Sequence, residues 1–238
     1  MTAPELTARK QDISAEFNGI ARRYDWLGTY DFTFVRNIRK TAERMELGTA
    51  PRVLDVCCGT GQSMTATLQA YPDADITGID RSPGMLAIAR SKPIAQKVRI
   101  VEGNATDPRG AGIEGDFDAV LSSWGIRNIP DTDLALQTVF DVLKPGGRFG
   151  MHEFVLANRK DKKIQWDVLS WGFIVPFGKL TSPRSSMYSY LWKSVVDWDT
   201  VDELCDRMRA VGFTDVKVEG FGLWWSGILH SIVATKPA

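Results

Sequence analysis

The chain has 238 residues, of which 44% are hydrophobic and 24% charged, which is ordinary for a single large globular domain. Its 29 Lys and Arg residues equal its 29 Asp and Glu residues, so no net electric field draws nucleic acid and we expect no nucleic-acid partner. Three cysteines, two of them adjacent, argue against a disulfide framework and for the cytoplasm, and no Cys or His spacing predicts a metal site.

The N-terminal part is expected to form a helical cover. Residues 1–10 are polar and charged, which predicts a loose tail and not a signal peptide. Over residues 12–48, apolar side chains recur at the helical period, so we expect helices there. The apolar residues that fall on common faces are Phe17, Ile20, Ala21 and Tyr24, and then Phe34, Ile38 and Met45.

Residues 50–155 alternate between strand and helix patterns. Ser82 followed by Pro83 predicts one helix start, and the spacing of Leu136 and Val139 indicates the buried stripe of another helix. The alternation with short turns is typical of an α/β fold with a Rossmann-like, doubly wound, mostly parallel sheet. The strands are expected at 52–56, 74–79, 98–101, 117–121 and 148–154, the last of them after a helix stop at 144–147.

The alternation ends after Phe154. Residues 156–198 are rich in aromatic residues, Pro and Ser, which predicts an insertion that forms a lid over the sheet. Its aromatic rings either form the core of that lid or line a pocket for a flat apolar ring. The sequence leaves these two alternatives open.

The last part of the chain, residues 199–238, is expected to complete a single domain. Thr200 and Glu203 have the spacing of a capping box, which predicts a helix. The stretches 216–218 and 228–234 then read as two strands that close the sheet as an antiparallel hairpin.

Three signals fall at the ends of three successive strands. Gly59 and Gly61 form a tight turn that lets a ligand approach the backbone, Asp80 can accept both hydroxyls of a ribose, and Asn104 can read an adenine edge. Each also has a plain structural explanation, a tight turn for the glycines and for Asn104 and a helix cap for Asp80, and for Asn104 alone the plain turn is favoured. Together they outline an adenosine across one crevice. No third glycine completes the dinucleotide pattern, which argues against a nicotinamide dehydrogenase.

Five stretches carry a resemblance to a known family. They are FNGIARRYD at 17–25, VLDVCCGTG at 53–61, GIDRSPGML at 78–86, WGIRNI at 124–129 and LKPGG at 143–147. The chain resembles the class I S-adenosylmethionine-dependent methyltransferases and, among them, the ubiquinone/menaquinone-biosynthesis C-methyltransferase family. The resemblance is dense over residues 12–155 and weaker afterwards.

The resemblance implies S-adenosyl-L-methionine as cofactor and S-adenosyl-L-homocysteine as product. Asp55 and the glycine turn would hold the methionine part, Asp80 the ribose and Asn104 the adenine. The chain departs from the family where Cys57 replaces the first glycine of the turn. The implied cofactor-binding residues are Asp55, Cys57, Gly59, Thr60, Gly61, Asp80, Arg81, Met85, Asn104, Ala105, Ser122 and Ser123.

The resemblance also implies the acceptor, an apolar aromatic small molecule methylated on a ring carbon, such as a demethylmenaquinol-like quinol or phenol. The candidates on the acceptor side are Arg127 and Asn128, with Tyr24 in the cover. A ring carbon beside a phenol becomes nucleophilic when the hydroxyl ionises, so His152 and Glu153 are candidate proton acceptors. Arg127 is alternatively a surface ion pair, and His152 a satisfied core histidine.

Two other functions stay open at this point. The Trp-rich lid and a C-terminal end unlike that of the family favour an O- or N-methyltransferase of a secondary metabolite or lipid headgroup. A cofactor-binding regulator without catalysis is the other. Whether the chain forms a homodimer, or contacts the inner face of a membrane from the cytoplasm, is likewise left open.

Overall fold

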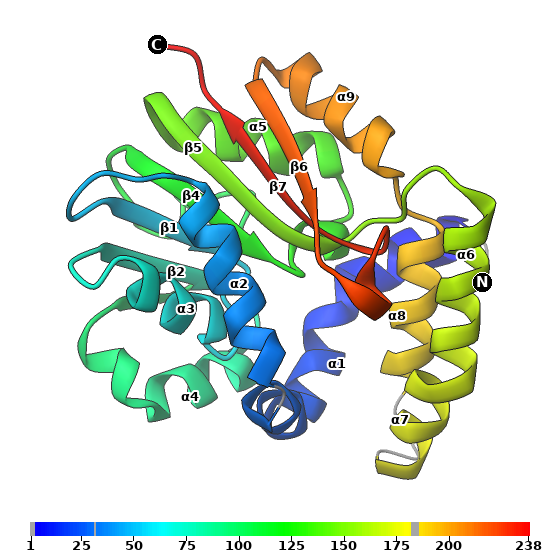
Figure 1. The fold of residues 1–238 in the computed structure, drawn as a ribbon. Helices are drawn as coiled ribbons and strands as arrows, with labels where there is room; N and C mark the ends of the chain where they lie inside the picture. The colour runs from blue at the N-terminus through cyan, green and yellow to red at the C-terminus, as the bar shows by residue number, and fades with distance from the viewer. Residues whose placement is uncertain (1–2, 31, 182–185) are drawn as a thin grey trace.

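The computed structural model describes residues 3–30, 32–181 and 186–238, except for the side chains of residues 3–8, 11, 12, 24, 27–30, 32, 181 and 223. Within these residues one sheet of seven strands runs through the molecule in the order β3-β2-β1-β4-β5-β7-β6 (Figure 1). β1 to β5 are parallel, and β7 is antiparallel to both β5 and β6. The strands are β1 Arg52–Val56, β2 Asp75–Asp80, β3 Arg99–Glu102, β4 Phe117–Ser123, β5 Leu143–Phe154, β6 Thr214–Gly220 and β7 Leu229–Thr235.

These strands confirm the predicted α/β sheet and its closing hairpin, with one difference at β5. The strand begins at Leu143, where the sequence indicates the end of a helix, because Leu143 pairs with Phe117. The register then shifts, and Ala119 pairs with Arg148. Gly146, with φ of 76°, lies in the irregular stretch between the two pairings. The preceding helix does end as predicted, at Val142, but the strand starts earlier than predicted and holds the glycines in a bulge.

Helices cover both faces of the sheet. On one face Ile38, Met64 and Leu86 are buried in a common core, and on the other face Leu136 and Leu204 are. The predicted stripe of the helix around Leu136 is thereby confirmed. The helices of the first face are α2 Phe32–Arg44, α3 Gln62–Ala70 and α4 Pro83–Ser91, and those of the second are α5 Thr132–Val142 and α9 Val201–Val211.

The predicted helix starts are confirmed by their caps. The hydroxyl of Ser82 accepts a hydrogen bond from the backbone N–H of Met85 (3.3 Å). Thr200 and Glu203 form the reciprocal capping box of α9. Such caps satisfy the backbone N–H groups that a helix start leaves without partners.

The N-terminal helix α1 spans Ala3–Tyr30, so the loose tail predicted for residues 1–10 is wrong from residue 3 onward. Long-range contacts hold this part of the helix. Arg9 donates two hydrogen bonds to Glu16 (2.8 and 2.6 Å), and its guanidinium lies 4.8 Å from the ring centre of Tyr190. Lys10 is 92% buried. Such contacts between distant segments are invisible to a local pattern.

The lid is made of helices. Trp166 and Tyr190 are fully buried in it. Trp166 packs in one cluster with Val195 and Ile228, and Tyr190 packs in another with Ile13 of α1, so the lid is held to its neighbours by two small apolar clusters. In Figure 1 these helices stand beside the sheet, next to α1. The elements are α6 Lys160–Leu169, the π-turn η3 Ser170–Ile174, α7 Val175–Thr181 and α8 Met187–Val196, followed after β6 by the short turn η4 Leu223–Trp225. No described helix is long and apolar enough to cross a membrane.

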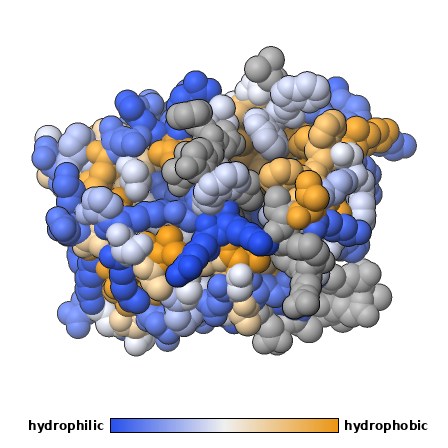
Figure 2. Space-filling view, turned by 90° about the horizontal axis from the view of Figure 1, so that it is seen from below, coloured by the Kyte–Doolittle hydropathy of each residue, from blue (hydrophilic) through white to orange (hydrophobic). Residues whose placement is uncertain are grey.

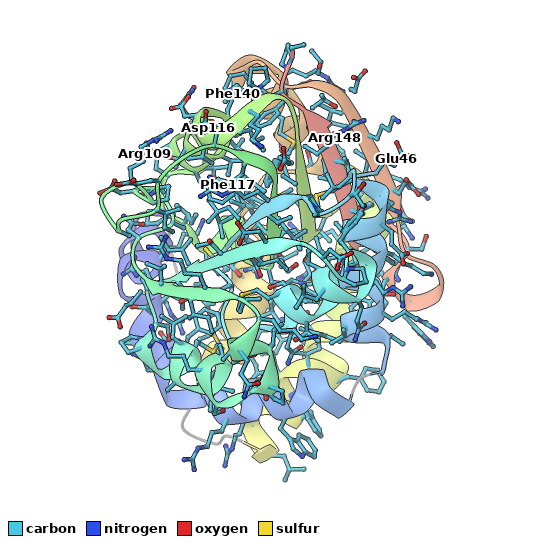
Figure 3. All side chains as sticks on the ribbon, turned by 90° about the vertical axis from the view of Figure 1, so that its left-hand side faces the viewer. Glu46, Arg109, Asp116, Phe117, Phe140 and Arg148 are labelled. Carbon is cyan, nitrogen blue, oxygen red and sulfur yellow. The ribbon has the colours of Figure 1, made fainter. Side chains whose placement is uncertain are left out.

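The two ends of the sheet differ in character. Figure 3 labels Arg109 and Asp116, which form an ion pair of 3.1 Å at the end away from α1 and the lid, near the buried ring of Phe117. Arg52 lies over that ring at 4.6 Å from its centre. This end is closed by packing and ion pairs, so the carboxyl ends of the parallel strands are where a ligand can enter.

Candidate functional site

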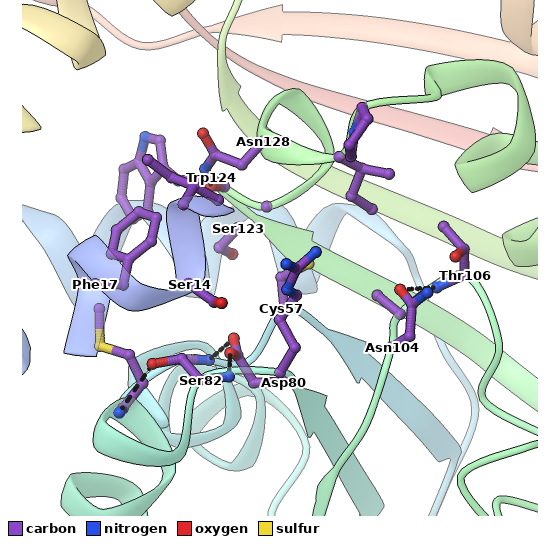
Figure 4. Close-up of a pocket in the computed structure, with 18 of the residues that line it drawn as sticks. Ser14, Phe17, Cys57, Asp80, Ser82, Asn104, Thr106, Ser123, Trp124 and Asn128 are labelled. Carbon is purple, nitrogen blue, oxygen red and sulfur yellow. Dashed lines mark hydrogen bonds between the residues drawn. The ribbon is translucent and has the colours of Figure 1, made fainter. Parts of the chain in front are cut away.

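A pocket of about 270 Å³ lies where the first four strands end. It is lined by Gly59 after β1, Asp80 at the end of β2, Asn104 after β3 and Ser123 at the end of β4 (Figure 4). The parallel arrangement brings these strand ends to one edge of the sheet. α1 closes the pocket with Ile13, Ser14 and Phe17.

The turn between β1 and α3 has an unusual backbone. Cys57, Gly59 and Gly61 have φ of 58°, 52° and 84°. This left-handed region suits glycine and is rarely adopted by other residues. Cys57 thus keeps a side chain in a conformation that favours glycine, and it lines the pocket. Gly61 is the N-cap residue of α3, so backbone N–H groups of a helix start lie beside the pocket.

Asp80 joins two turns at the pocket wall. Its carboxylate accepts hydrogen bonds from the backbone N–H groups of Gly59 (2.9 Å) and Ser82 (2.8 Å). Burial raises the pKa of Asp80, and these two hydrogen bonds oppose the rise. A carboxylate offers about four acceptor sites, so capacity remains for hydroxyl groups of a ligand.

Asp55 lies beneath the glycine turn and does not line the pocket. Its carboxylate accepts a hydrogen bond from the hydroxyl of Ser63 on α3. Burial raises the pKa of Asp55 to about 7, and the hydrogen bond from Ser63 opposes the rise. The pair fixes the end of β1 to the first turn of α3.

The far wall of the pocket is apolar with one amide. Ile129 and Leu134 face it from the segment after β4, and Ala105 from the loop after β3. Asn104 accepts a hydrogen bond from the backbone N–H of Thr106 (3.1 Å), which holds its side chain at the wall (Figure 4). An apolar slot with a fixed amide at its edge suits a planar heterocycle.

Two further features of the pocket lie at Ser123 and Gly125. The hydroxyl oxygen of Ser123 lines it, is buried and has no hydrogen-bond partner among the described residues. A Cβ atom at Gly125 would lie 2.5 Å from the Cβ of Cys57, so the backbone approaches closely there. Buried polar atoms without partners are costly, and a polar ligand would satisfy this one.

A second cavity of about 320 Å³ lies next to the first. The two share Phe17, Trp124 and Asn128. The second is mainly lined by apolar side chains from α1, α2, β5, α8 and η4, among them Ile20, Phe34, Phe154, Tyr188, Leu191 and Trp225. A flat apolar molecule in this cavity would face a ligand in the first across the shared residues.

Trp124 forms the partition between the cavities. Its backbone is also left-handed, with φ of 53°. Its ring stacks on Phe34 (4.2 Å between centres) and meets His152 edge-on (4.6 Å). Asn128 is fixed beside it, donating to the Trp124 carbonyl (2.9 Å) and accepting from the hydroxyl of Tyr190 (2.9 Å).

Arg127 takes part in a buried ion pair. Its Nε lies 3.3 Å from Glu153 on β5, and both side chains are nearly inaccessible. Its Nη1 donates to the hydroxyl of Ser194 on α8. Burial raises the pKa of Glu153, and the positive charge of Arg127 opposes the rise. Burial and the charge of Arg127 lower the pKa of Lys10 to about 8.

His152 is a buried histidine with one ring nitrogen unused. Its Nδ1 lies 3.0 Å from the hydroxyl of Thr41, which donates to the carbonyl of Asn37. This arrangement favours a proton on Nδ1 and leaves Nε2 as an acceptor. Nε2 has no hydrogen-bond partner among the described residues, and His152 lines the second cavity. Burial and Arg44 lower the pKa of His152 to about 3, so the ring is neutral.

The structure brings most of the residues named from the sequence to these two cavities. Arg127 and His152 line the second cavity, and Asn128 lines both. The backbone of Tyr24 lies in α1, and its side chain lies outside the described residues. The predicted cofactor residues that line the first cavity are Cys57, Gly59, Asp80, Arg81, Met85, Asn104, Ala105 and Ser123. Asp55, Thr60, Gly61 and Ser122 lie behind this lining.

Several lining residues were not among the predicted site residues. Trp124 is the first residue of the WGIRNI stretch and could have been found there, because the stretch follows a strand end. Phe17 lies in another matching stretch but reads as a buried helix face. Asn37 also lines the second cavity, while Thr41 and Ser194 line neither cavity and instead bind His152 and Arg127. These three lie in helices without any recognisable motif, so no sequence signal connects them to the site.

Comparison with known proteins gives one family. A model of the ubiE/COQ5 methyltransferase family matches residues 5–236. A demethylmenaquinone methyltransferase of Staphylococcus aureus (strain JH9) is 31% identical over 219 residues, which is 90% of this chain and 90% of that protein.

Solved structures share the fold. The plantazolicin methyltransferase BamL, in complex with a triazolic desmethylPZN analog and SAH, has a TM-score of 0.69 at 13% identity, covering 99% of this chain and 98% of that one. Phosphoethanolamine N-methyltransferase 2 of Haemonchus contortus, in complex with S-adenosyl-L-methionine, has a TM-score of 0.59 at 18% identity. That match covers 85% of this chain, which spans about half (53%) of the longer protein. At these identities the likeness supports the fold alone.

Proposed function

Because the chain belongs to the ubiE/COQ5 methyltransferase family, and is therefore an S-adenosylmethionine-dependent methyltransferase, we propose that it methylates a ring carbon of an apolar hydroquinone. The relative named a demethylmenaquinone methyltransferase suggests a demethylmenaquinol-like acceptor. The observation that carries the proposal is the apolar second cavity, which meets the first at Trp124 and Asn128.

When bound, S-adenosylmethionine supplies a methyl group on a positively charged sulfur, which is an activated electrophile. Carbon methylation forms a bond between that methyl group and the ring carbon beside a hydroxyl. The methyl–sulfur bond breaks with its electron pair on sulfur, giving S-adenosylhomocysteine, and the ring carbon releases its proton to water. While the methyl group moves, the protein must align the ring and keep water away from the methyl group, and the proton reaches water only afterwards. Alignment alone can contribute about 7–11 kcal/mol.

The proposed cofactor residues act from three strand ends. Asp80 accepts the ribose hydroxyls, and Asn104 faces the adenine edge. The N–H groups of Gly59 and Gly61 already donate to Asp80 and to the Cys58 carbonyl, so the first N–H groups of α3 face the methionine carboxylate. Arg81, Met85, Ala105 and Ser123 complete the lining, while Asp55, Thr60, Gly61 and Ser122 support the turn from behind. Residues 12–48 and 156–198 act as cover and lid of a single domain whose cofactor-binding core is 50–155 and whose C-terminal helix and strands are 199–238.

The proposed acceptor residues lie around the second cavity. The hydroxyl of the acceptor donates a hydrogen bond to Nε2 of His152, which increases electron density on the adjacent ring carbon. Arg127 contributes positive charge near the hydroxyl oxygen, and Asn128 sets the angle of the ring against Trp124. Tyr24 remains a candidate on the cover helix. An acceptor of this kind dissolves in lipid, so the proposal includes contact of the cytoplasmic protein with a membrane surface.

The test is methyl transfer from labelled S-adenosylmethionine to a chemically reduced demethylnaphthoquinone with a short side chain. We expect a product with the added methyl group on the ring carbon, identified by mass spectrometry and NMR. A protein that binds S-adenosylhomocysteine but transfers methyl only to hydroxyl or amine acceptors would refute carbon methylation.

A further inference from the structure

The outer surface of the lid carries a row of exposed apolar side chains. We call these five side chains the lid stripe. Each is far more exposed than is usual for a large apolar side chain. They are Ile164 (62%), Val168 (62%), Phe173 (67%), Phe177 (47%) and Leu180 (80%). They come from α6, the π-turn η3 and α7. Figure 2, which views the molecule from below Figure 1, shows hydrophobic atoms gathered toward the side on which α7 lies. Contiguous exposed apolar surface of this kind marks an interaction site.

The π-turn η3 allows the lid stripe to follow one side of the continuous helical segment formed by α6, η3 and α7. The spacings along the stripe are 4, 5, 4 and 3 residues, and the spacing of 5 falls on η3, between Val168 and Phe173. In a regular α-helix a step of 5 residues would rotate the next side chain far from the row. A π-turn has more residues per turn and so returns Phe173 to the same side. Trp171, which is 49% exposed in the same turn, is not part of the row and lies against the ring of Trp192 (5.2 Å between centres).

The lid also carries an excess of positive charge. Residues 156–198 contain seven Lys and Arg residues and three Asp residues, whereas the whole chain is balanced at 29 of each sign. Lys160, Lys163 and Lys179 are exposed near the two ends of the lid stripe. An apolar row flanked by lysines matches the apolar interior and anionic surface of a lipid bilayer.

The same helical layer forms one wall of the acceptor cavity. Tyr188 and Leu191 of α8 line that cavity, as does Trp225. The neighbouring Trp224 is 77% exposed, and its carbonyl accepts a hydrogen bond from Gln165 on α6 (2.8 Å). An exposed indole beside the stripe is placed as tryptophans are at the boundary between lipid and water.

We propose that the lid stripe, with Trp224 beside it, docks on an anionic lipid bilayer from which the acceptor enters the second cavity. The inference rests on the proposed function, since it concerns the supply of that acceptor. Charge favours a bilayer over a second copy of the chain as the partner of this surface. A twofold contact would bring the positive lids of two copies together, and like charges oppose such a contact.

The experiment is flotation of the full chain with vesicles of phosphatidylcholine alone or mixed with phosphatidylglycerol. We expect the protein to float with the mixed vesicles, and added salt to reduce the bound fraction. The double variant Phe173→Ser/Leu180→Ser should lower the partition coefficient about tenfold or more, because it removes exposed apolar area. The control is Val218→Ser, an exposed apolar residue on β6 outside the lid, which should bind as the unchanged protein does.

The outcomes separate docking from catalysis. The double variant should keep its activity on the short-chain acceptor in water and lose it on an acceptor embedded in vesicles. Activity in water without any vesicle binding would overturn the docking proposal and leave the proposed function intact. A dimer in solution that the double variant dissociates would also overturn it, since a second copy would then cover the stripe.

Discussion

Cys57 and Gly125 form a tight pair at the wall of the first cavity. Cys57 holds a left-handed backbone, which costs a residue with a side chain roughly 1–2 kcal/mol relative to glycine. Its Cβ atom also occupies the space that a side chain at Gly125 would need. Cysteine at position 57, where the family has glycine, is thus tolerated because Gly125, which faces it, has no side chain.

We therefore expect Gly125→Ala to weaken binding of S-adenosylhomocysteine by about tenfold or more, since the added Cβ would lie 2.5 Å from that of Cys57. Adding Cys57→Gly should recover part of the affinity, because it removes the two Cys57 atoms at 2.5 and 3.1 Å, and the Ser122 hydroxyl that stays at 2.7 Å can rotate about its side-chain bond. Titration calorimetry measures both. Gly48→Ala is the control, since a Cβ there meets nothing within 4 Å. Equal affinities for the single and double variants would contradict this reading.

His152 is buried, and its Nε2 atom has no hydrogen-bond partner among the described residues. Thr41 fixes its Nδ1, and the rings of Trp124 and Phe221 fix its plane. A pKa near 3 makes it a weak proton acceptor, so its proposed role is to receive a hydrogen bond from the acceptor hydroxyl and not to carry the proton away.

For His152→Phe we expect kcat/KM to fall about 10- to 100-fold on a hydroquinone, since a hydrogen bond in an apolar cavity is lost. On an analogue whose hydroxyl beside the reacting carbon is replaced by hydrogen, the variant and the unchanged protein should be equally slow. His230→Phe, at the other histidine, is the control. A rate that falls as pH drops through 6.5, and only when His152 is present, would contradict a neutral ring.

The cover helix α1 is the element that joins the two cavities. Phe17 lines both of them, and the neighbouring Asn18 binds the start of α4. Its side-chain oxygen accepts hydrogen bonds from the N–H of Gly84 (2.8 Å) and the hydroxyl of Ser82 (2.7 Å). Ser82 in turn donates its backbone N–H to Asp80, so the cover is connected to the carboxylate of the cofactor pocket.

We expect Asn18→Ala to raise the dissociation constant of S-adenosylhomocysteine roughly three- to tenfold, because the two hydrogen bonds that close α1 over the pocket are lost. The free energy of unfolding should change little, since Asn18 is exposed. Arg39→Ala, which removes an exposed ion pair with Glu43 on the neighbouring helix, is the matched control. Unchanged affinity would show that the cover does not help to hold the ligand.

At the scale of the whole molecule, buried carboxyl groups link folding to pH. The pKa of Asp55 is about 7 in the fold against an ordinary value of 3.8. Between these values the native state binds more protons than the unfolded chain, so stability is present at low pH and is lost as pH rises through 7. The lowered pKa of His152 has the opposite effect, since its contribution to stability grows as pH rises. The contribution of Asp55 is therefore measured as the difference between the unchanged protein and a variant without its carboxylate.

Asp55→Asn keeps an acceptor for Ser63 and removes the titration. We expect the unchanged protein to lose stability relative to this variant, by roughly 1 kcal/mol per pH unit, as pH rises from 4 to about 7. Urea unfolding at several pH values measures the difference. Asp73→Asn, at an exposed position, should give no such trend. A difference that is constant with pH would contradict the raised pKa.

Local patterns were sufficient for most of the elements. The strand over 52–56, the helix start at Ser82 and the capping box at Thr200 are fixed by residues that lie within a few positions of one another. The start of α1 and the start of β5 were missed, because contacts of Arg9 with Tyr190 and pairing of Leu143 with Phe117 decide them.

The sequence by itself determined the α/β sheet and the pocket at its strand ends, because glycine turns and Asp80 act through backbone conformation and nearby N–H groups. Only the tertiary structure decided what surrounds the acceptor. Arg127 meets Ser194, and His152 meets Thr41, across more than 60 residues of chain in each case. Such pairs depend on how helices pack over the sheet. Packing is set by the whole molecule, so no single stretch of sequence contains it.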